Sequence, residues 1–429
     1  MARKTPGEIL ESYKPRLPKR FYAVLLRILI AFSTIGRKAE FKYDFNKRKM
    51  RGKQVIILAD HSSTDNYLYA IKGYPFVSPN VIVGYHNVLI KGLFRILLKA
   101  GVIPKRLYVP DMRTAVSVLR LAKQGASIMI FPEGIQSMAG STHPINPATV
   151  PLLKKLKIPV VLCKSRGAYL NRPRFDSSYR HGPMEFSYEL LFSEEDLAEK
   201  SRDELYGILL DKFRYNDFLW NQKEGNVYRG KHKNAFGIDK ILFICPHCGR
   251  QFSLRVEEDD IVCECGNRIR VDERYRLIPQ GDSSIAFERI DEWFAWERDA
   301  VRAEIEKDGF SFSYDAEYLT VDTEKLGNDR CKKLGEGRIT IDRSKFVYVG
   351  TKNEKELVIE IPMSAIPSAP FVSGRGNELF YENDYFRFIP KEDHRISVKV
   401  LLMIEELHNL SDGAWRKASE DVYQIGGVL

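Results

Sequence analysis

Apolar and polar positions follow two different rhythms in the first half of the chain. Between about residues 52 and 168, short β-branched runs typical of buried strands are separated by segments with apolar residues at helical spacing. The strand-like runs are QVIILA, NVIVGY, SIMIF and IPVVLCKS, and the helix-like segments are LIKGLFRILLKAG, RTAVSVLRLAKQG and TVPLLKKLK. This alternation predicts an α/β fold with a mostly parallel sheet and flanking helices. In such sheets, functional residues gather beyond the carboxyl ends of the strands.

A different pattern begins beyond a charged amphipathic segment, which predicts a connector helix. From about residue 310, short strand-like runs are separated by turn residues, and the helical segment SVKVLLMIEELHNL follows them. This order predicts a small antiparallel β-barrel closed by a helix. It is similar to the order in pleckstrin-homology and GRAM-like modules, while a structural or oligomerising addition is an equal alternative. The predicted organisation is an α/β domain over residues 1–238, a cysteine-containing module over 239–280, the connector helix over 281–309 and the barrel module over 310–429.

The charge of the chain adds an expectation about its partners. The 429 residues carry a formal net charge of +10, which favours nucleic acid, a membrane surface or a phosphorylated substrate. Lysines and arginines are spread along the chain, and the stretch RVEEDD in the cysteine-containing module is mixed in charge. Both observations count against nucleic-acid binding. That function stays a rival interpretation, but no nucleic acid is expected as a partner.

One apolar segment, FYAVLLRILIAFSTIG at residues 21–36, predicts either a buried helix or a helix lying on a membrane. It is shorter than the roughly 18 to 20 apolar residues that span a bilayer, and Arg27 interrupts it. Basic residues flank it on both sides, which suits lipid head groups. The N-terminus is polar and shows no secretory signal. We expect membrane lipids as partners, through peripheral or monotopic contact at the cytoplasmic face of the membrane.

Four of the six cysteines gather within about twenty residues. They form a Cys-x2-Cys pair and a Cys-x-Cys pair, each followed by glycine, and they are Cys245, Cys248, Cys263 and Cys265. Such paired thiolates are typical of a tetrahedral zinc site, and the strand-like runs around them fit a zinc ribbon. Four thiolates leave no open coordination position, so we expect a structural and not a catalytic zinc. The alternative, buried free cysteines, leaves the paired spacing unexplained.

Polar residues follow two of the predicted strands at their carboxyl ends. The run VIILADHSSTD places His61 just beyond a strand and Asp65 four residues later. A histidine can act as a general base when a carboxylate holds its other ring nitrogen. Downstream, IMIFPEGIQSMAG places Glu133 in a strand-to-loop turn. Taken singly, each feature is more often structural than catalytic.

In this order, the motifs resemble those of glycerophospholipid acyltransferases of the lysophosphatidate type. The resemblance is carried by DHSSTD at 60–65, GVIPKRLYVPDMRTA at 101–115, FPEGIQS at 131–137 and KIPVVLC at 157–163, and it covers roughly residues 20–210. It implies an acyltransferase-type α/β fold. It also implies transfer of a fatty acyl group from acyl-CoA or acyl-carrier protein to the hydroxyl of a lysophospholipid similar to 1-acylglycerol 3-phosphate.

The resemblance further implies roles for individual residues. His61 would deprotonate the acceptor hydroxyl, which attacks the acyl thioester directly, and the nearby aspartate would orient His61. Basic residues of the second motif would hold the acceptor phosphate, and these are Lys105, Arg106 and Arg113. The acceptor-binding motif would comprise Phe131, Pro132, Glu133, Gly134, Gln136 and Ser137.

Two departures from the family pattern leave the substrate and the activity open. The family places four residues between the histidine and the aspartate; that position is Asn66 here, and Asp65 is one position early. Either residue would orient His61, although an asparagine stabilises an imidazolium poorly. Gln136 stands where the family usually has a phosphate-binding arginine, and glutamine carries no charge. We favour an active enzyme because His61 and FPEG are intact, with a catalytically inactive lipid-binding scaffold as the alternative.

Overall fold

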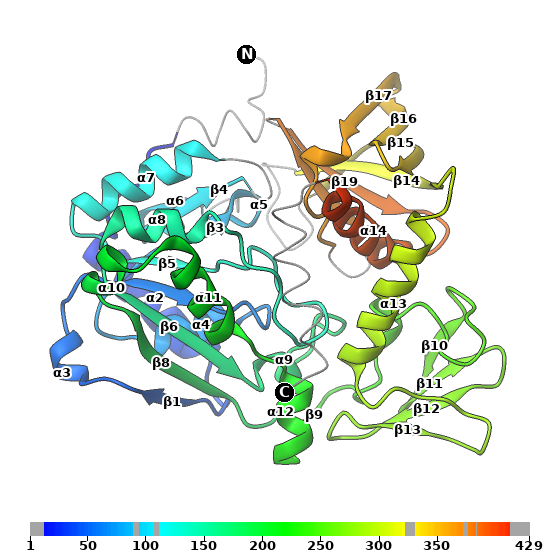
Figure 1. Ribbon diagram of the computed structural model, residues 1–429, viewed down its shortest axis with the longest axis horizontal. Coiled ribbons are helices and arrows are strands. Elements are labelled where there is room, and N and C mark those ends of the chain that lie inside the picture. The colour runs from blue at the N-terminus through cyan, green and yellow to red at the C-terminus, as the bar shows by residue number, and fades with distance from the viewer. Residues whose placement is uncertain are drawn as a thin grey trace.

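A seven-stranded sheet forms the centre of the N-terminal half of the molecule (Figure 1). The computed structural model describes residues 13–88, 94–106, 111–321, 331–371, 376–382 and 384–411. The strand order is β1-β8-β6-β2-β5-β3-β4, and only the neighbours β6 and β8 run antiparallel. The mostly parallel α/β sheet predicted from the sequence is therefore confirmed. The strands are β1 (Glu40–Tyr43), β2 (Ile56–Ala59), β3 (Asn80–Gly84), β4 (Val102–Lys105), β5 (Ile128–Ile130), β6 (Val160–Arg166) and β8 (Glu185–Phe192).

Helices cover both faces of this sheet because its central strands are apolar on both sides. In β2, Ile56 and Leu58 enter one hydrophobic cluster, while Ile57 and Ala59 enter another on the opposite face. The first cluster includes side chains of α7 (Met112–Lys123), α8 (Thr149–Leu156), α10 (Glu194–Glu199) and α11 (Arg202–Phe213). The second includes side chains of α2 (Arg20–Ser33) and α4 (Asn66–Lys72). Shorter helices are α3 (Lys47–Met50), α5 (Tyr85–Val88), α6 (Phe94–Lys99), α9 (Ala168–Asn171) and α12 (Asp217–Glu224).

A small antiparallel sheet carries the cysteine-containing module. Its order is β10-β11-β12-β13, which is also the chain order. The long helix α13 (Ile290–Ile305) then leads toward the C-terminal sheet (Figure 1). The strands are β10 (Leu254–Glu257), β11 (Asp260–Cys263), β12 (Arg268–Val271) and β13 (Leu277–Pro279), and the remaining elements are β7 (Arg180–His181), β9 (Arg229–Gly230) and η1 (Ile238–Lys240).

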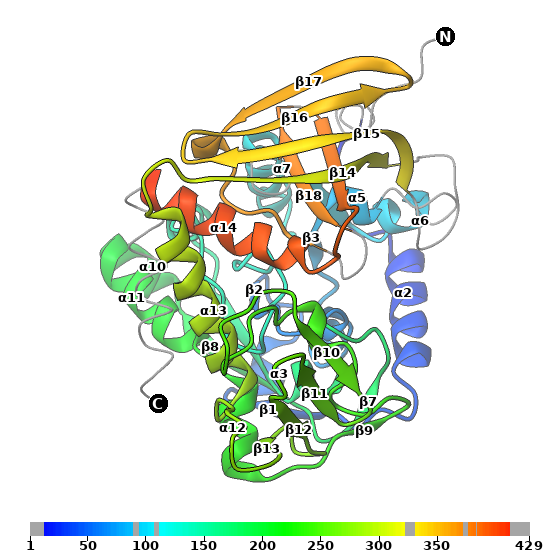
Figure 2. The same ribbon diagram turned by 90° about the vertical axis from the view of Figure 1, so that its right-hand side faces the viewer.

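The C-terminal sheet is a curled antiparallel half-barrel. Its order is β17-β16-β15-β14-β19-β18, so β17 and β18 are its two edges in the described part of the chain. The predicted antiparallel barrel closed by a helix is confirmed in part: the sheet is a half-barrel, and the final helix α14 (Ile396–Ser411) packs against it (Figure 2). The elements are β14 (Ser311–Val321), β15 (Cys331–Asp342), β16 (Lys345–Lys352), β17 (Lys355–Pro362), η2 (Met363–Ala365), β18 (Asn377–Tyr381) and β19 (Asp384–Pro390).

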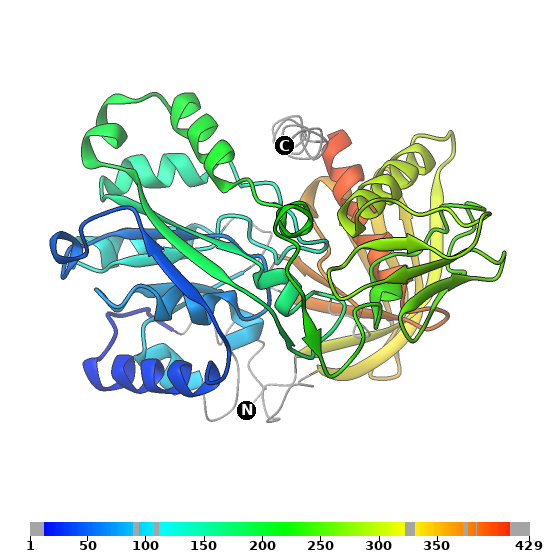
Figure 3. The same ribbon diagram turned by 90° about the horizontal axis from the view of Figure 1, so that it is seen from below.

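One hydrophobic core continues from the loops of the α/β half through the cysteine module to the C-terminal half-barrel. It includes Ile135 from a loop, Tyr169 from α9, Trp293 from α13 and Leu401 from α14. Seen from below, the α/β half and the C-terminal half lie side by side (Figure 3). The C-terminal half therefore packs against the loops that follow the central strands. The domain boundaries stay predictions, because a shared core does not decide where one folding unit ends.

Candidate active site and metal centre

His61 lies just beyond the carboxyl end of the central strand β2. The preceding residue, Asp60, is buried and accepts hydrogen bonds from the backbone N–H of Ser165 (3.0 Å) and from its hydroxyl (2.7 Å). Ser165 belongs to the neighbouring strand β6. These bonds fix the start of the loop, so the sheet itself positions the histidine.

Asn66, and not Asp65, contacts the imidazole. His61 Nδ1 lies 3.3 Å from Asn66 Oδ1, and Asn66 Nδ2 donates to the backbone oxygen of Asp60 at 2.5 Å. Because Asn66 Nδ2 donates to the carbonyl of Asp60, the amide oxygen of Asn66 is the atom that faces the imidazole. Nδ1 therefore carries the proton and donates it, and Nε2 keeps its lone pair. This is the tautomer that a general base needs at Nε2.

Asp65 faces away from the ring and pairs with two arginines. Its Oδ2 lies 2.8 Å from Nη1 of Arg37 and 3.2 Å from Nη1 of Arg172. Ser63 donates to its other oxygen at 3.3 Å. Of the two orienting residues left open by the sequence, the structure places Asn66 on His61 and Asp65 in this arginine cluster.

Burial holds the imidazole neutral. Burial lowers the pKa of His61 to about 4; hydrogen bonds with Asn66 and with the backbone of Ser63 oppose this effect, and the positive charge of Arg174 strengthens it. The ring is also 5.0 Å, centroid to centroid, from the ring of Phe131. At neutral pH His61 is therefore in the form that accepts a proton.

The Pro132–Gly134 turn aims a carboxylate at the His61 loop. Gly134 N–H donates to the oxygen of Phe131 at 3.1 Å and closes the turn, and Gly134 adopts φ +71°, which favours glycine. Glu133 is only 3% exposed; its Oε1 accepts from the N–H of His61 (2.9 Å) and its Oε2 from the N–H of His143 (2.8 Å). Burial raises the pKa of Glu133 to about 8, against these two donors. Each oxygen of Glu133 accepts one backbone N–H, so this side chain ties the Pro132–Gly134 turn to the His61 loop.

Two further residues of this motif also support the loop. Ser137 N–H donates to the oxygen of His61 at 2.9 Å, and the Ser137 hydroxyl donates to the oxygen of Ser141 at 2.6 Å. Pro132 is buried. The FPEG-x-x-S segment thus acts here as the frame of the histidine loop.

Gln136 contacts Arg174, an arginine near the site that the sequence analysis did not identify. Its Oε1 accepts from the hydroxyl of Thr64 (3.1 Å) and from Nη1 of Arg174 (2.7 Å). Arg174 lies almost forty positions later and outside every motif. Only its contacts in the folded chain show that it is close to the site.

The three basic residues of the second motif lie farther from His61. Lys105 ends β4, which is separated from β2 by β5 and β3, roughly 14 Å at ordinary strand spacing. Burial lowers the pKa of Lys105. Arg106 donates to the oxygen of Glu382 at 3.1 Å, and Arg113 donates to the oxygen of Tyr13. None of the hydrogen bonds described for these three residues reaches the histidine loop.

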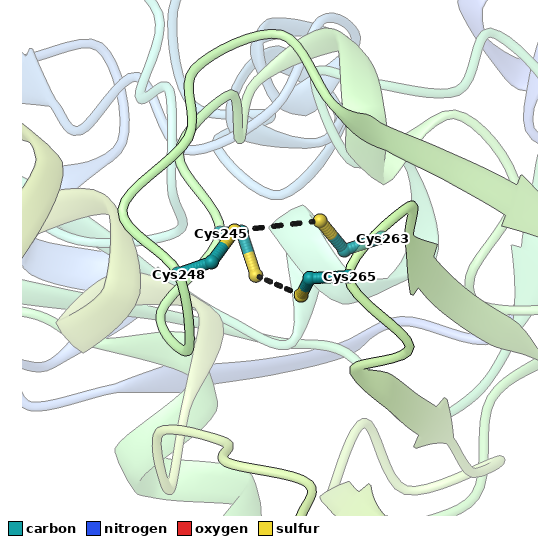
Figure 4. Close-up of side chains that lie close together, drawn as sticks. All are labelled: Cys245, Cys248, Cys263 and Cys265. Atoms are coloured by element: carbon teal, nitrogen blue, oxygen red, sulfur yellow. Dashed lines mark hydrogen bonds between the residues drawn. The ribbon is translucent and has the colours of Figure 1, made fainter.

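The four clustered cysteines turn their sulfur atoms toward one another (Figure 4). All four sulfurs lie within 4.8 Å of each other, and Cys245–Cys265 and Cys248–Cys263 are each 3.8 Å apart. A tetrahedral ion with sulfur bonds of about 2.3 Å separates its sulfurs by about 3.8 Å. Ser253 and Asn267 lie within hydrogen-bonding distance of two of the sulfurs. The cluster fits a metal ion.

Helix α2 presents its apolar side outward and its arginine inward. Arg27 donates to the backbone oxygens of Ile71 and Tyr74 at the end of α4, which fixes the rotation of α2. The exposed apolar residues of α2 and the turn after it are Phe21, Val24, Ile28, Leu29, Phe32 and Ile35. In Figure 2, α2 stands at the outer edge of the molecule. Among the described helices, none has the length and apolar character needed to cross a bilayer.

Comparisons with known proteins give one distant structural neighbour to report. No protein-family model matches the chain, and no curated protein matches it. The chain is similar to the crystal structure of the 1-acyl-sn-glycerophosphate (LPA) acyltransferase PlsC from Thermotoga maritima, at TM-score 0.37 and 13% identity, over 44% of this chain and 78% of that chain. A match at this TM-score supports no functional conclusion, so the function below is argued from the geometry around His61.

Proposed function

We propose that the protein is an O-acyltransferase that moves a fatty acyl group from a thioester, acyl-CoA or acyl-carrier protein, to the hydroxyl of a lysophospholipid. One observation carries the proposal: a neutral histidine at the carboxyl end of the central strand, with its Nδ1 3.3 Å from Asn66 Oδ1. Its position before the FPEG turn supports the same chemistry.

The reaction would need no covalent enzyme intermediate. The acceptor hydroxyl gives its proton to His61 Nε2 as its oxygen attacks the thioester carbonyl carbon. The new C–O bond forms, the tetrahedral intermediate collapses, and the C–S bond breaks. The departing thiolate takes the proton from the imidazolium. Asn66 holds Nδ1–H throughout, and its neutral oxygen stabilises the imidazolium less than a carboxylate does.

Acyl transfer by the purified full chain tests the proposal. Labelled oleoyl- or palmitoyl-CoA, or acyl-carrier protein, is supplied with lysophosphatidate and other lysophospholipids in detergent or vesicles. Product that disappears in His61→Ala but persists in His181→Ala, an exposed histidine at the end of β7, supports the proposal. Binding of acyl-CoA without product from any acceptor would favour the scaffold interpretation.

We infer that the cysteine cluster holds a structural zinc. The sulfur spacing matches a tetrahedral ion, and four thiolates leave no position for substrate. The zinc would cross-link the loops around β11, next to Trp293 of α13, which donates to the oxygen of Ile244 at 3.0 Å. Its contribution would be to the packing of the module between the two halves.

We further propose that α2 lies in one leaflet at the cytoplasmic face of a membrane. Its outward face is apolar, Phe21 and Phe32 being 70% and 67% exposed, and it is flanked by basic residues. An exposed apolar stripe with cations at its ends suits the boundary between acyl chains and head groups. Long-chain substrates reside in that layer.

A further inference from the structure

Arg174 is held beside the candidate site from two sides. It lies in the loop between α9 and β7; its Nη1 donates to Gln136 Oε1 at 2.7 Å, and its Nη2 donates to the oxygen of Phe371. Phe371 belongs to the connection between β17 and β18 of the C-terminal half-barrel. Arg174 as a residue is half-buried although its Nε is buried, so the C-terminal half orients a cation at a partly exposed position.

The side-chain nitrogen of Gln136, Nε2, is a hydrogen-bond donor without an acceptor in the described part of the chain. Its Oε1 already accepts from Thr64 and Arg174, so its Nε2 points elsewhere. Gln136 is 6% exposed, and Nε2 has no hydrogen-bond partner among the residues that the structure describes. Leaving a buried donor unpaired is costly. An amide kept in this state is suited to an acceptor atom brought by a ligand.

Both groups lie at the histidine loop. Ser137, the residue after Gln136, donates its N–H to the oxygen of His61 at 2.9 Å. Thr64, which contacts Gln136, is in the same loop as His61. The charge of Arg174 is among the causes that lower the pKa of His61. A guanidinium and an amide donor beside a base form a set that recognises a phosphate next to a reacting hydroxyl.

We propose that Arg174 and the amide of Gln136 bind the phosphate of the acyl acceptor, and that Arg174 sets the preference for phosphorylated acceptors. The inference rests on the proposed function. The positive charge that binds the phosphate would come from Arg174, which hydrogen-bonds to the C-terminal half. That half would then be part of the substrate site. Lys105, Arg106 and Arg113, the candidates from the sequence, stand on the β4 side of the sheet.

The test compares two acceptors that differ only in the phosphate, lysophosphatidate and monoacylglycerol. In Arg174→Gln we expect KM for lysophosphatidate to rise about 10- to 100-fold, the loss of a charge-assisted hydrogen bond, while KM for acyl-CoA stays unchanged. The double variant Gln136→Arg with Arg174→Gln moves the charge to the neighbouring position and should restore much of the preference. Arg172→Gln is the matched control, because Arg172 carries the same charge two positions away and pairs with Asp65.

Two outcomes would overturn the inference. An unchanged preference in Arg174→Gln would do so, and so would a rise in KM for acyl-CoA, which would assign Arg174 to the donor's phosphates. Should the wild-type protein transfer no acyl group, the proposed function fails first. Equilibrium binding of lysophosphatidate then tests the site alone, with Gln136→Leu as a second variant that leaves Arg174 in the chain. Equal affinity of the wild type and both variants would overturn the inference.

Discussion

Replacement of Asn66 by alanine tests how His61 is held in its reactive form. The bond from His61 Nδ1 to Asn66 Oδ1 spans 3.3 Å and joins neutral groups, so it is worth about 1 kcal/mol. As the imidazole takes the acceptor's proton, the same bond gains a charged donor and becomes worth about 1.5–3 kcal/mol. The additional roughly 0.5–2 kcal/mol is lost only from the transition state of Asn66→Ala. We therefore expect kcat to fall about 2- to 30-fold.

The matched variant is Asp65→Asn, because Asp65 contacts Arg37 and Arg172 and not the ring. Initial rates are measured in detergent with acyl-CoA and lysophosphatidate. Urea unfolding gives the folded fraction, since Asn66→Ala also removes the donor to the oxygen of Asp60. Asp65→Asn should keep kcat close to wild type. A large loss in Asp65→Asn together with an unaffected Asn66→Ala would refute the assignment.

Three further predictions concern pH, metal and membrane. Because burial lowers the pKa of His61 to about 4, kcat/KM should fall only as pH drops through that value; an acid limb near 6.5, the ordinary histidine range, would contradict this. Cys265→Ser should lose the zinc, measured by elemental analysis, and should melt at a lower temperature; retention of the full metal content would argue against the four-sulfur site. Phe32→Ser should weaken sedimentation with anionic vesicles about 5- to 10-fold, whereas Leu190→Ser on β8 should not, and equal binding of the two variants would count against α2 as the contact.

The sheet was predictable because its signal is local and strong. The β-branched runs that became β2, β3 and β6 are short, continuous and bounded by helical segments, which is the pattern of strands buried on both faces. Parallel strands place their carboxyl ends at one edge, so His61 and Glu133 were expected near each other. The structure brings them together through the 2.9 Å hydrogen bond from His61 N–H to Glu133.

The details that decide the chemistry depend on contacts that the sequence does not display. Asn66 is the first residue of α4 and Asp65 precedes it; a shift of one residue turns a helical side chain by about 100°. Arg27 looks like an interruption of an apolar face, yet it points inward because carbonyls at the end of α4 need donors. Arg174 reaches Gln136 only through the path of the chain between them. Propensity and periodicity carry no information on such partners.

The position of Asp65 links the site loop to the helix proposed to lie in the membrane. Arg37 follows the end of α2 and pairs with Asp65 at 2.8 Å, and the next residue, Asn66, holds His61. A lysolipid is anchored by its acyl chain, so its hydroxyl stays near the level of the head groups. With α2 in the interface, the buried carboxylate of Asp65 would fix the height of the histidine loop relative to that layer. The acid at position 65 would then serve the placement of the loop at a membrane and not the imidazole, so Asp65→Asn leaves kcat in detergent close to wild type.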